Sequence, residues 1–384
     1  MRCDLTIFTP TYNRGYILNT LYESLKRQTC KAFEWIVIDD ASSDDTELLV
    51  RSWAVETKDF YICYYKINHG GKHRAFNKAV KLARSQAFFT VDSDDYLVDN
   101  AVEKIIAWFK KVENDDKFAG ISGMRGYNET SPIGGTGNIN IGEYIDATNL
   151  ERDKFHLQGD KAEIYKTAIL KKYPFVEFPN EYFITEATVW NLIAMNGYKI
   201  RWYNEIIYVG SYLEDGLTYR GNELFYKNPR GWLYWLYIKG KYALAEDMLL
   251  EYMCWYIYNH NSSLVYYMPE LYRHKVNRLL EEGISYLNQY IKKRKIKTYA
   301  IYGLGNWGEM FWKMRECVNA SLNAGIDERV REWKNIPVYG PEQLYKIDVD
   351  MILVTQKNKS NHVYYSLNKF RGYKLFFRDL FILS

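Results

Sequence analysis

Short hydrophobic runs alternate with helically spaced hydrophobic residues over the first hundred positions. Residues 5–9, 35–38 and 61–65 have the length and composition of buried strands. Leucines with the spacing of one helix face follow the first run, and an apolar stripe within 76–83 leads into the run 87–91. This β-α-β-α-β-α-β order predicts a mostly parallel sheet with right-handed crossovers, in the α/β class.

An acidic turn follows the strand predicted at 87–91. Asp92, Ser93, Asp94 and Asp95 come directly after it, at the edge of the sheet where open α/β proteins bind ligands. Three carboxylates on one turn repel one another unless a hard cation lies among them, and Mg²⁺ or Mn²⁺ prefers such oxygen ligands. The alternative is a solvated acidic turn in which Asp95 or Asp99 caps the next helix.

The other predicted strand ends also carry polar groups that could meet one ligand. Asp40 ends the second strand, and its carboxylate suits the imide N–H of a uracil ring. Gly70 and Gly71 allow a close backbone approach, while Lys72 and Arg74 supply positive charge for phosphate. Each feature alone is also explained as a cap, a turn or a surface charge.

Four segments occur in an order that resembles family 2 glycosyltransferases of the GT-A fold. They are residues 9–14, 38–44, 70–77 and 91–95. The resemblance covers about residues 1–220. It implies a nucleotide-sugar donor, a Mn²⁺ or Mg²⁺ cofactor and inversion at the anomeric carbon.

The resemblance also implies a role for individual residues. The expected nucleotide-sugar-binding residues are Thr9, Thr11, Tyr12, Asp40, Lys72, Asn77, Asp92 and Ser93. The expected metal ligands are Asp94, which we rank first, with Asp92 and Asp95.

The catalytic base departs from the family pattern, because the family's usual Glu-Asp pair is Glu186-Ala187 here. Glu186 is our first candidate, and its alternative role is a favourable charge at a helix N-terminus. Glu214 and Asp215, in a loop containing glycine, are the second candidates. We assign Asp160 to the acceptor side, where it binds sugar hydroxyls or joins an internal hydrogen-bond network.

A second α/β pattern follows near the C-terminus. Strands are predicted at 298–302, 322–326 and 351–354, and the first leads into a G-x-G-x-x-G turn and a helix. The turn and an acid at the second strand end give a possible second nucleotide site of Gly303, Gly305, Gly308 and Asp327. The segment resembles small nucleotide-binding-like domains appended to polysaccharide-biosynthesis enzymes, so a role in assembly is equally open.

These patterns suggest three regions. Residues 1–222 form the GT-A domain, with 1–110 for the nucleotide-sugar and 111–222 for the acceptor side. Residues 223–293 are rich in aromatic residues and suit two to four helices, as a linker, a lid, an oligomer surface or a platform for a lipid-linked acceptor. Residues 294–384 form the small Rossmann-like domain, after a basic run that reads as a linker.

Composition narrows the partners. The 384 residues are 47% hydrophobic with a net charge of +4, which gives little support for nucleic-acid binding. Five scattered cysteines favour free thiols. No apolar run reaches a transmembrane length, and a strand begins at once, so we expect no signal peptide and a cytoplasmic location. Peripheral contact with the inner face of the membrane and the oligomeric state stay open.

The sequence therefore predicts an inverting glycosyltransferase of surface-polysaccharide synthesis. It would move a sugar from a nucleotide donor, with UDP favoured, to a hydroxyl of a glycan or lipid-linked acceptor by metal-assisted displacement. Two alternatives remain: an NAD(P)-dependent oxidoreductase using the C-terminal turn, and a non-catalytic sugar-nucleotide-binding protein, which Ala187 favours.

Overall fold

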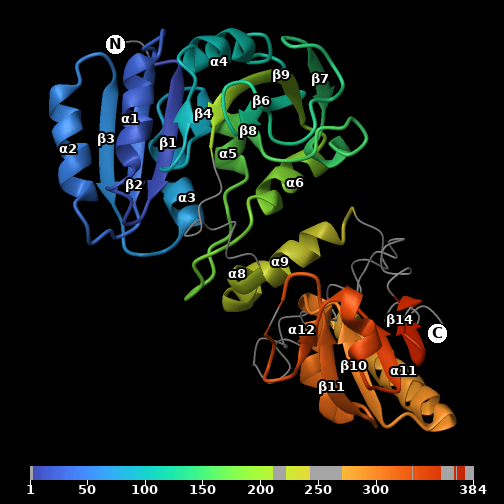
Figure 1. The fold of residues 1–384 in the computed structure, drawn as a ribbon. Helices are drawn as coiled ribbons and strands as arrows, with labels where there is room; N and C mark the ends of the chain where they lie inside the picture. The colour runs from blue at the N-terminus through green and yellow to red at the C-terminus, as the bar shows by residue number, and fades with distance from the viewer. Residues whose placement is uncertain are drawn as a thin grey trace. The chain divides into compact units, whose positions relative to one another are not determined.

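A computed structural model of the chain describes residues 3–210, 222–242, 270–330, 332–355, 367–368 and 370–376. Its contacts divide the protein into two compact units, Met1–Tyr242 and Ala243–Ser384, which are described separately (Figure 1). The expected helical region 223–293 is thereby shared between them.

The first unit is built on a mixed sheet in the order β3-β2-β1-β4-β8-β6-β9-β5, with β7 paired to β9. Strands β1 to β4 are parallel to one another, and β8 runs antiparallel to its two neighbours. The expected mostly parallel α/β sheet is confirmed. The strands are β1 Leu5–Thr11, β2 Phe33–Asp39, β3 Tyr61–Lys66, β4 Ala87–Thr90, β5 Tyr96–Leu97, β6 Phe118–Gly126, β7 Tyr144–Ala147, β8 Lys161–Lys166 and β9 Lys199–Val209.

Helices cover both faces of this sheet (Figure 1). One hydrophobic core contains residues of α1, α2 and α4, and a second contains residues of α3, α5 and α6. The two cores explain why strands such as β2 are buried along their whole length. The helices are α1 Leu18–Arg27, α2 Thr46–Glu56, α3 Lys72–Leu82, α4 Ala101–Phe109, η1 Asn149–Glu151, α5 Thr167–Lys172, α6 Ala187–Met195, α8 Asn222–Lys227 and α9 Pro229–Lys239.

Strand β1 continues through Pro10 to Thr11, whereas the sequence suggested that the proline ends it. The ladder between β1 and β4 stops at the pair Phe8–Thr90, but the ladder with β2 continues to Thr11. Beyond Phe8, β1 therefore has a strand neighbour on one side only, and a residue without an N–H is tolerated there.

Helices α8 and α9 belong to the first unit. Glu181 accepts hydrogen bonds from the backbone N–H groups of Arg230 (2.8 Å) and Gly231 (2.8 Å), at the start of α9. The Asn228 side chain accepts hydrogen bonds from the backbone of Tyr182 and Phe183. These contacts attach the beginning of the aromatic region to the segment before α6.

The second unit has an all-parallel sheet in the order β12-β11-β10-β13-β14. All three strands expected from the sequence are confirmed, and the helix after the glycine turn is present. The elements are α11 Glu270–Arg294, β10 Thr298–Tyr302, α12 Asn306–Met314, η3 Arg315–Cys317, β11 Ser321–Ile326, β12 Val338–Tyr339, η4 Pro341–Lys346, β13 Met351–Val354 and β14 Tyr373–Phe376.

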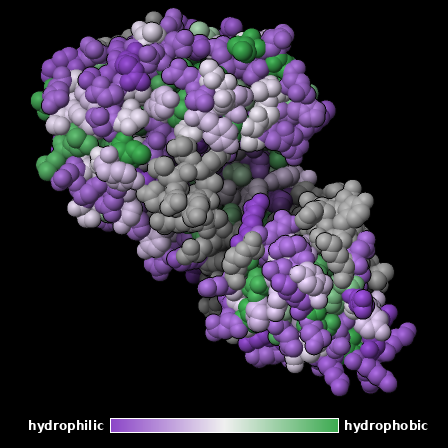
Figure 2. All heavy atoms as spheres, in the orientation of Figure 1, coloured by the Kyte–Doolittle hydropathy of each residue, from purple (hydrophilic) through white to green (hydrophobic). Residues whose placement is uncertain are grey.

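The basic run before β10 is not simply a linker. Lys292, Lys293 and Arg294 form the last turn of α11, where positive charge is favourable against the helix dipole. No helix in the described ranges is both long enough and apolar enough to cross a bilayer. On the face of the first unit visible in Figure 2, hydrophobic side chains are scattered among hydrophilic ones.

The cysteines agree with the expected free thiols over the described residues. Cys3, Cys30, Cys63 and Cys317 are all free. Burial raises the pKa of Cys3 to about 11, so this thiol stays protonated near neutral pH.

Candidate active site

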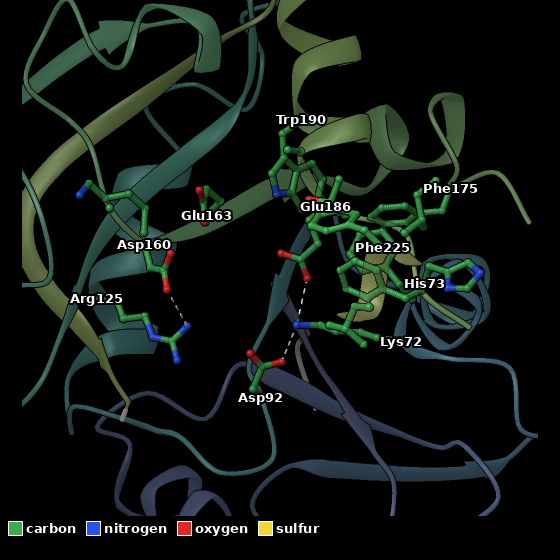
Figure 3. A pocket seen from close by; sticks show the side chains of 18 of the residues that line it. Lys72, His73, Asp92, Arg125, Asp160, Glu163, Phe175, Glu186, Trp190 and Phe225 are labelled. Carbon is green, nitrogen blue, oxygen red and sulfur yellow. Dashed lines mark hydrogen bonds and ion pairs between the residues drawn. The ribbon is translucent and has the colours of Figure 1, made fainter. Parts of the chain in front are cut away.

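A cavity of about 480 Å³ lies in the first unit at the end of β4 (Figure 3). This volume falls in the usual range for small-molecule sites. Its wall contains charged side chains from several elements, with aromatic side chains between them. The charged lining residues are Lys72, Asp92, Arg125, Arg152, Asp160, Lys161, Glu163 and Glu186, and the aromatic ones include Phe76, Phe175, Tyr182, Phe183, Trp190 and Phe225.

Lys72 joins two of the predicted site residues. Its ammonium lies 2.7 Å from Asp92 Oδ1 and 2.9 Å from Glu186 Oε1 (Figure 3). Burial acts to lower the pKa of Lys72, but the two carboxylates outweigh it and raise this pKa above its ordinary value. The first turn of α3 and the N-cap of α6 therefore meet over the acidic turn.

The three carboxylates of the acidic turn have different surroundings. Asp95 is buried and accepts hydrogen bonds from Arg125 (2.7 Å) and from Tyr208, so its role is internal. Burial, and secondly the charge of Asp92, raise the pKa of Asp94. Burial alone would raise the pKa of Asp92, but the positive charges of Lys72 and Arg125 together outweigh this effect and lower it. Ser93 is buried beside them.

The acidic turn can contribute two carboxylates to a divalent cation. Asp92 and Asp94 repel each other, and a cation between them would relieve this repulsion. Within the described residues there is no group of three or more His, Cys, Asp or Glu side chains that could hold a metal ion. Two oxygen-donating carboxylates fit Mg²⁺ or Mn²⁺, which would complete its shell with water and substrate phosphate.

Asp40 is tied to the glycine loop that follows β3. Its Oδ1 accepts a hydrogen bond from Gly70 N (2.6 Å), and its Oδ2 accepts one from Gly71 N (2.8 Å) and lies 3.0 Å from the ring of His69. A side chain at Gly71 (φ 88°) would overlap the carbonyl oxygen of Tyr182. The glycine is thus required by a backbone contact inside the protein, whereas the sequence suggested close approach to a ligand.

Aromatic rings stack beside Asp40. His69 lies between Tyr12 (ring centroids 4.7 Å apart) and Tyr182 (4.9 Å). Both tyrosines are about half exposed, so they offer flat faces to a planar ligand. The Thr11 hydroxyl is buried without a hydrogen-bond partner in the described part of the chain. Thr9 instead accepts a hydrogen bond from Trp35 Nε1 (2.9 Å) in the core.

Asn77 has an internal role that the sequence did not suggest. Its side chain donates to Phe175 O (2.9 Å) and Glu177 Oε1 (2.7 Å) and accepts from Phe175 N (3.0 Å). It does not line the cavity. Instead, it fixes the start of the segment between α5 and α6 against α3.

Strand β8 supplies lining residues that sequence reasoning missed. Lys161, Glu163 and Tyr165 point to the α3/α6 side, while Ala162 and Ile164 enter the opposite core. Burial raises the pKa of Glu163 to about 7. The alternation of larger polar and small or apolar residues along 161–165 was the available signal.

Two other expectations concern the acceptor side. Asp160 lines the cavity and lies 3.9 Å from the Arg125 guanidinium. Glu214 and Asp215, the second candidates for the base, fall outside the described residues.

Comparison with known families decides the class of this unit. Residues 6–173 match the family model for glycosyl transferase family 2. This domain is a family 2 glycosyltransferase domain.

Curated relatives of the family 2 domain are named as glycosyltransferases. The poly(ribitol-phosphate) beta-glucosyltransferase of Bacillus spizizenii is 26% identical over 137 residues, which cover 33% of this chain and 22% of the relative. The poly(ribitol-phosphate) beta-N-acetylglucosaminyltransferase TarP of Staphylococcus aureus is 30% identical over 37% of this chain and 44% of the relative. In both, the match spans less than half of the relative's own length.

A third relative is matched over more of its length. The GalNAc(5)-diNAcBac-PP-undecaprenol beta-1,3-glucosyltransferase of Campylobacter jejuni is 25% identical over 60% of this chain and 72% of the relative. Among solved structures, S. aureus TarS 1-349 in complex with UDP-GlcNAc has a TM-score of 0.48 at 17% identity, over 82% of this chain and 92% of that one.

In the second unit, the possible nucleotide site is built around an aspartate that is held by backbone hydrogen bonds. Asp327 accepts hydrogen bonds from the backbone N–H groups of Leu304 (2.9 Å), Arg329 (2.9 Å) and Val330 (3.1 Å). A side chain at Gly308 would meet Gly303 O at 2.5 Å, while the position of Gly305 is open. The residues come together as predicted, and Asp327 holds the turn.

Proposed function

We propose that this protein is an inverting glycosyltransferase that moves a sugar from a UDP-linked donor to a hydroxyl of a surface glycan or its lipid-linked precursor. The observation that carries this proposal is the pairing of Asp92 and Glu186 with one ammonium, that of Lys72, in one cavity. It brings a carboxylate suited to the diphosphate side and a carboxylate suited to the acceptor side within reach of the same substrate.

The names of the relatives support the substrate class. Two of them transfer sugars to poly(ribitol phosphate), and one acts on an undecaprenol-linked glycan. The shared feature is a hydroxyl on a polymer or lipid-linked acceptor of the cell surface. We extend this class to the present chain, with action at the cytoplasmic face of the membrane.

The nucleotide would lie against the stack of Tyr12, His69 and Tyr182. Asp40 Oδ1 accepts one hydrogen bond, from Gly70, so it keeps a lone pair for the imide N–H of uracil. The free hydroxyl of Thr11 lies at the end of the same strand pair. This arrangement is the reason for favouring UDP over other nucleotides.

The diphosphate would lie over the acidic turn. Asp94 and Asp92 would hold Mn²⁺ or Mg²⁺, which when bound offsets the negative charge on the leaving diphosphate. Lys72 lies at the start of α3, where its ammonium can exchange a carboxylate partner for a phosphate oxygen.

The proton of the acceptor hydroxyl needs a base on the opposite side of the sugar. Glu186 lines the cavity, its side chain is 44% exposed, and it lies at the N-cap of α6. When Lys72 turns to phosphate, the Glu186 carboxylate is released to accept the proton while the hydroxyl oxygen attacks the anomeric carbon. In this scheme Glu186 takes the role of the acid that the family usually carries at the next position, where this chain has Ala187.

Donor hydrolysis tests the proposal directly. The full-length protein is incubated with UDP-glucose or UDP-N-acetylglucosamine and MnCl₂, and released UDP is measured. We expect metal-dependent release that falls by at least about a hundredfold in Asp94→Ala. Failure of the wild-type protein to bind or hydrolyse any nucleotide sugar contradicts the proposal, whereas equal activity of Asp94→Ala contradicts the metal site alone.

The second unit supports a separate proposal. The turn of Gly303, Gly305 and Gly308 at the start of α12 would bind a nucleotide phosphate. A thermal-shift titration with NAD(H) tests this site together with the oxidoreductase alternative. A redox function would require both a shift and hydride transfer, and it would leave the cavity of the first unit without a role.

A further inference from the structure

The inner end of the cavity is a recess of about 60 Å³ between β8 and α6. Its lining includes Glu163, Tyr165 and Trp190, along with Lys72 and Glu186. A recess of this size has room for ordered water or for one substituent of a sugar ring. The ring itself would lie in the larger cavity outside it.

Tyr165 lines this recess and has a buried hydroxyl. The residue is 2% exposed, and its hydroxyl has no hydrogen-bond partner in the described part of the protein. Its ring stacks on Trp190, with centroids 4.3 Å apart. Stacking needs only the ring, so phenylalanine would serve the fold equally well, and the hydroxyl has no structural use that the contacts reveal.

Glu163 carries a largely buried carboxylate that lacks a close cation. Its side chain is 16% exposed, and the nearest cation, Arg152, lies 4.0 Å away, which is too far for a hydrogen bond. Figure 3 shows Glu163 on the cavity wall between Asp160 and Trp190. Burying a carboxylate without a close partner destabilises a protein, so its presence on a cavity wall indicates a ligand that supplies the missing donors.

The geometry points to a sugar-binding subsite in which Glu163 and Tyr165 hydrogen-bond the hydroxyl or amide substituents of a pyranose ring. Trp190 lies beside them and offers an apolar surface to the ring. Because Glu163 and Tyr165 are two residues apart on one strand, the sheet fixes their spacing. The subsite deepens the proposed function, on which it rests, by assigning residues that select the sugar.

The ring can come from the donor or from the acceptor, and two measurements separate these sources. Calorimetry with MnCl₂ compares UDP with UDP-glucose and UDP-N-acetylglucosamine, so that the sugar contribution appears as the ratio of the dissociation constants. Saturation-transfer NMR with methyl β-glucoside and methyl β-N-acetylglucosaminide, with and without UDP, reports a ring that binds independently of the nucleotide.

We expect Glu163→Gln to weaken sugar binding about tenfold and Tyr165→Phe about fivefold in one of these two measurements, with the affinity for UDP unchanged. The matched controls are Glu205→Gln and Tyr203→Phe. Glu205 pairs with Lys104, and Tyr203 is buried in the opposite core, so neither lines the cavity. Both controls should bind sugars as the wild type does.

Unchanged sugar binding in both variants would overturn the inference and leave the recess as a site for water. An equal loss in the controls would also overturn it, since the effect would then be one of folding. If the wild type binds no UDP, the proposal of a UDP-linked donor is wrong. The glycoside measurement without UDP still decides whether the recess binds a sugar.

Discussion

In each unit an acidic residue lies at a strand end beside a glycine turn and accepts hydrogen bonds from backbone N–H groups. Asp40 accepts hydrogen bonds from Gly70 and Gly71, and Asp327 accepts them from three backbone N–H groups of its own unit. The units differ in what lies next to the acid. In the first, Asp92 follows β4, which lies two strands along the sheet from β2, and is paired with Lys72 at the wall of a cavity.

This difference separates a structural acid from a candidate functional one. Backbone donors fix a carboxylate permanently, because they cannot leave without local unfolding. A lysine side chain can rotate away and exchange its partner. A backbone-held acid such as Asp40 can therefore bind a ligand only with a lone pair that its donors leave free, whereas Asp92 can exchange its partner during a reaction, and the experiments below test that distinction.

The largest expected effect is on catalysis. Glu186→Gln should lower the turnover number for sugar transfer by about 10²–10⁴-fold with metal-dependent donor binding intact, since it removes the base and keeps the shape. Asp327→Asn is the counterpart in the second unit and should leave transfer unchanged. A fully active Glu186→Gln variant would move the assignment to the pair Glu214 and Asp215.

Asp327→Asn should instead affect stability. Burial opposes ionisation of Asp327, but hydrogen bonds from Arg329, Leu304 and Val330 outweigh it and lower the pKa of this carboxyl. Its contribution to stability is therefore present above the ordinary pKa of an aspartate and is lost as the pH falls through the lowered value. The variant should melt at a lower temperature than the wild type at pH 7, and the gap should narrow in acid.

The next effect concerns the glycine loop of the first unit. Gly71→Ala combines a positive φ with overlap of the Tyr182 carbonyl, and it should destabilise the protein by about 2–5 kcal/mol. Gly142 has a similar φ of 84° but open space around it, so Gly142→Ala should cost roughly 1–2 kcal/mol. Denaturant unfolding measures both, and equal losses would contradict the proposed role of the Tyr182 contact.

The smallest effect is a pH dependence at Glu163. Burial raises its pKa to about 7, so ionising the folded protein costs stability, and this cost appears as the pH rises from the ordinary glutamate value to about 7. Arg152 opposes the shift, while Glu186 and Asp160 add to it. Glu163→Gln should be more stable than the wild type by about 1–3 kcal/mol at pH 8 and equally stable at pH 4. If the difference in stability between Glu163→Gln and the wild type does not vary with pH, the raised pKa of Glu163 is not its cause.

Much of the fold could be predicted because it follows from periodicity. The strand-helix order of the first hundred residues and the strands of the second unit depend on apolar spacing, which is local information. Pro10 was harder to interpret, since its place inside β1 depends on where the β1–β4 ladder stops. The end of this ladder is set by the length of β4 and not by the residues around Pro10.

The candidate site was predicted in part, from the family resemblance and not from periodicity. Lys72, Asp92 and Glu186 do meet in one cavity, as the family resemblance implied. Asn77 and Asp95 are occupied instead by internal partners that lie far away in the sequence, Phe175 and Arg125 among them. Glu163 and Tyr165 were missed because a polar residue on a strand gains meaning only when the opposite wall is known.

Arg74 has a consequence for redesign of this enzyme. Its guanidinium donates to the carbonyl oxygens of Gly70, Phe178 and Glu181, and so clamps two cavity-bordering segments together. Tyr182 protrudes next to this clamp, with 47% of its surface exposed. Libraries intended to change the accepted nucleotide should therefore keep positions 71 and 74 constant and vary position 182. New side chains at position 182 would change the surface beside Arg74 without removing the hydrogen bonds of its guanidinium.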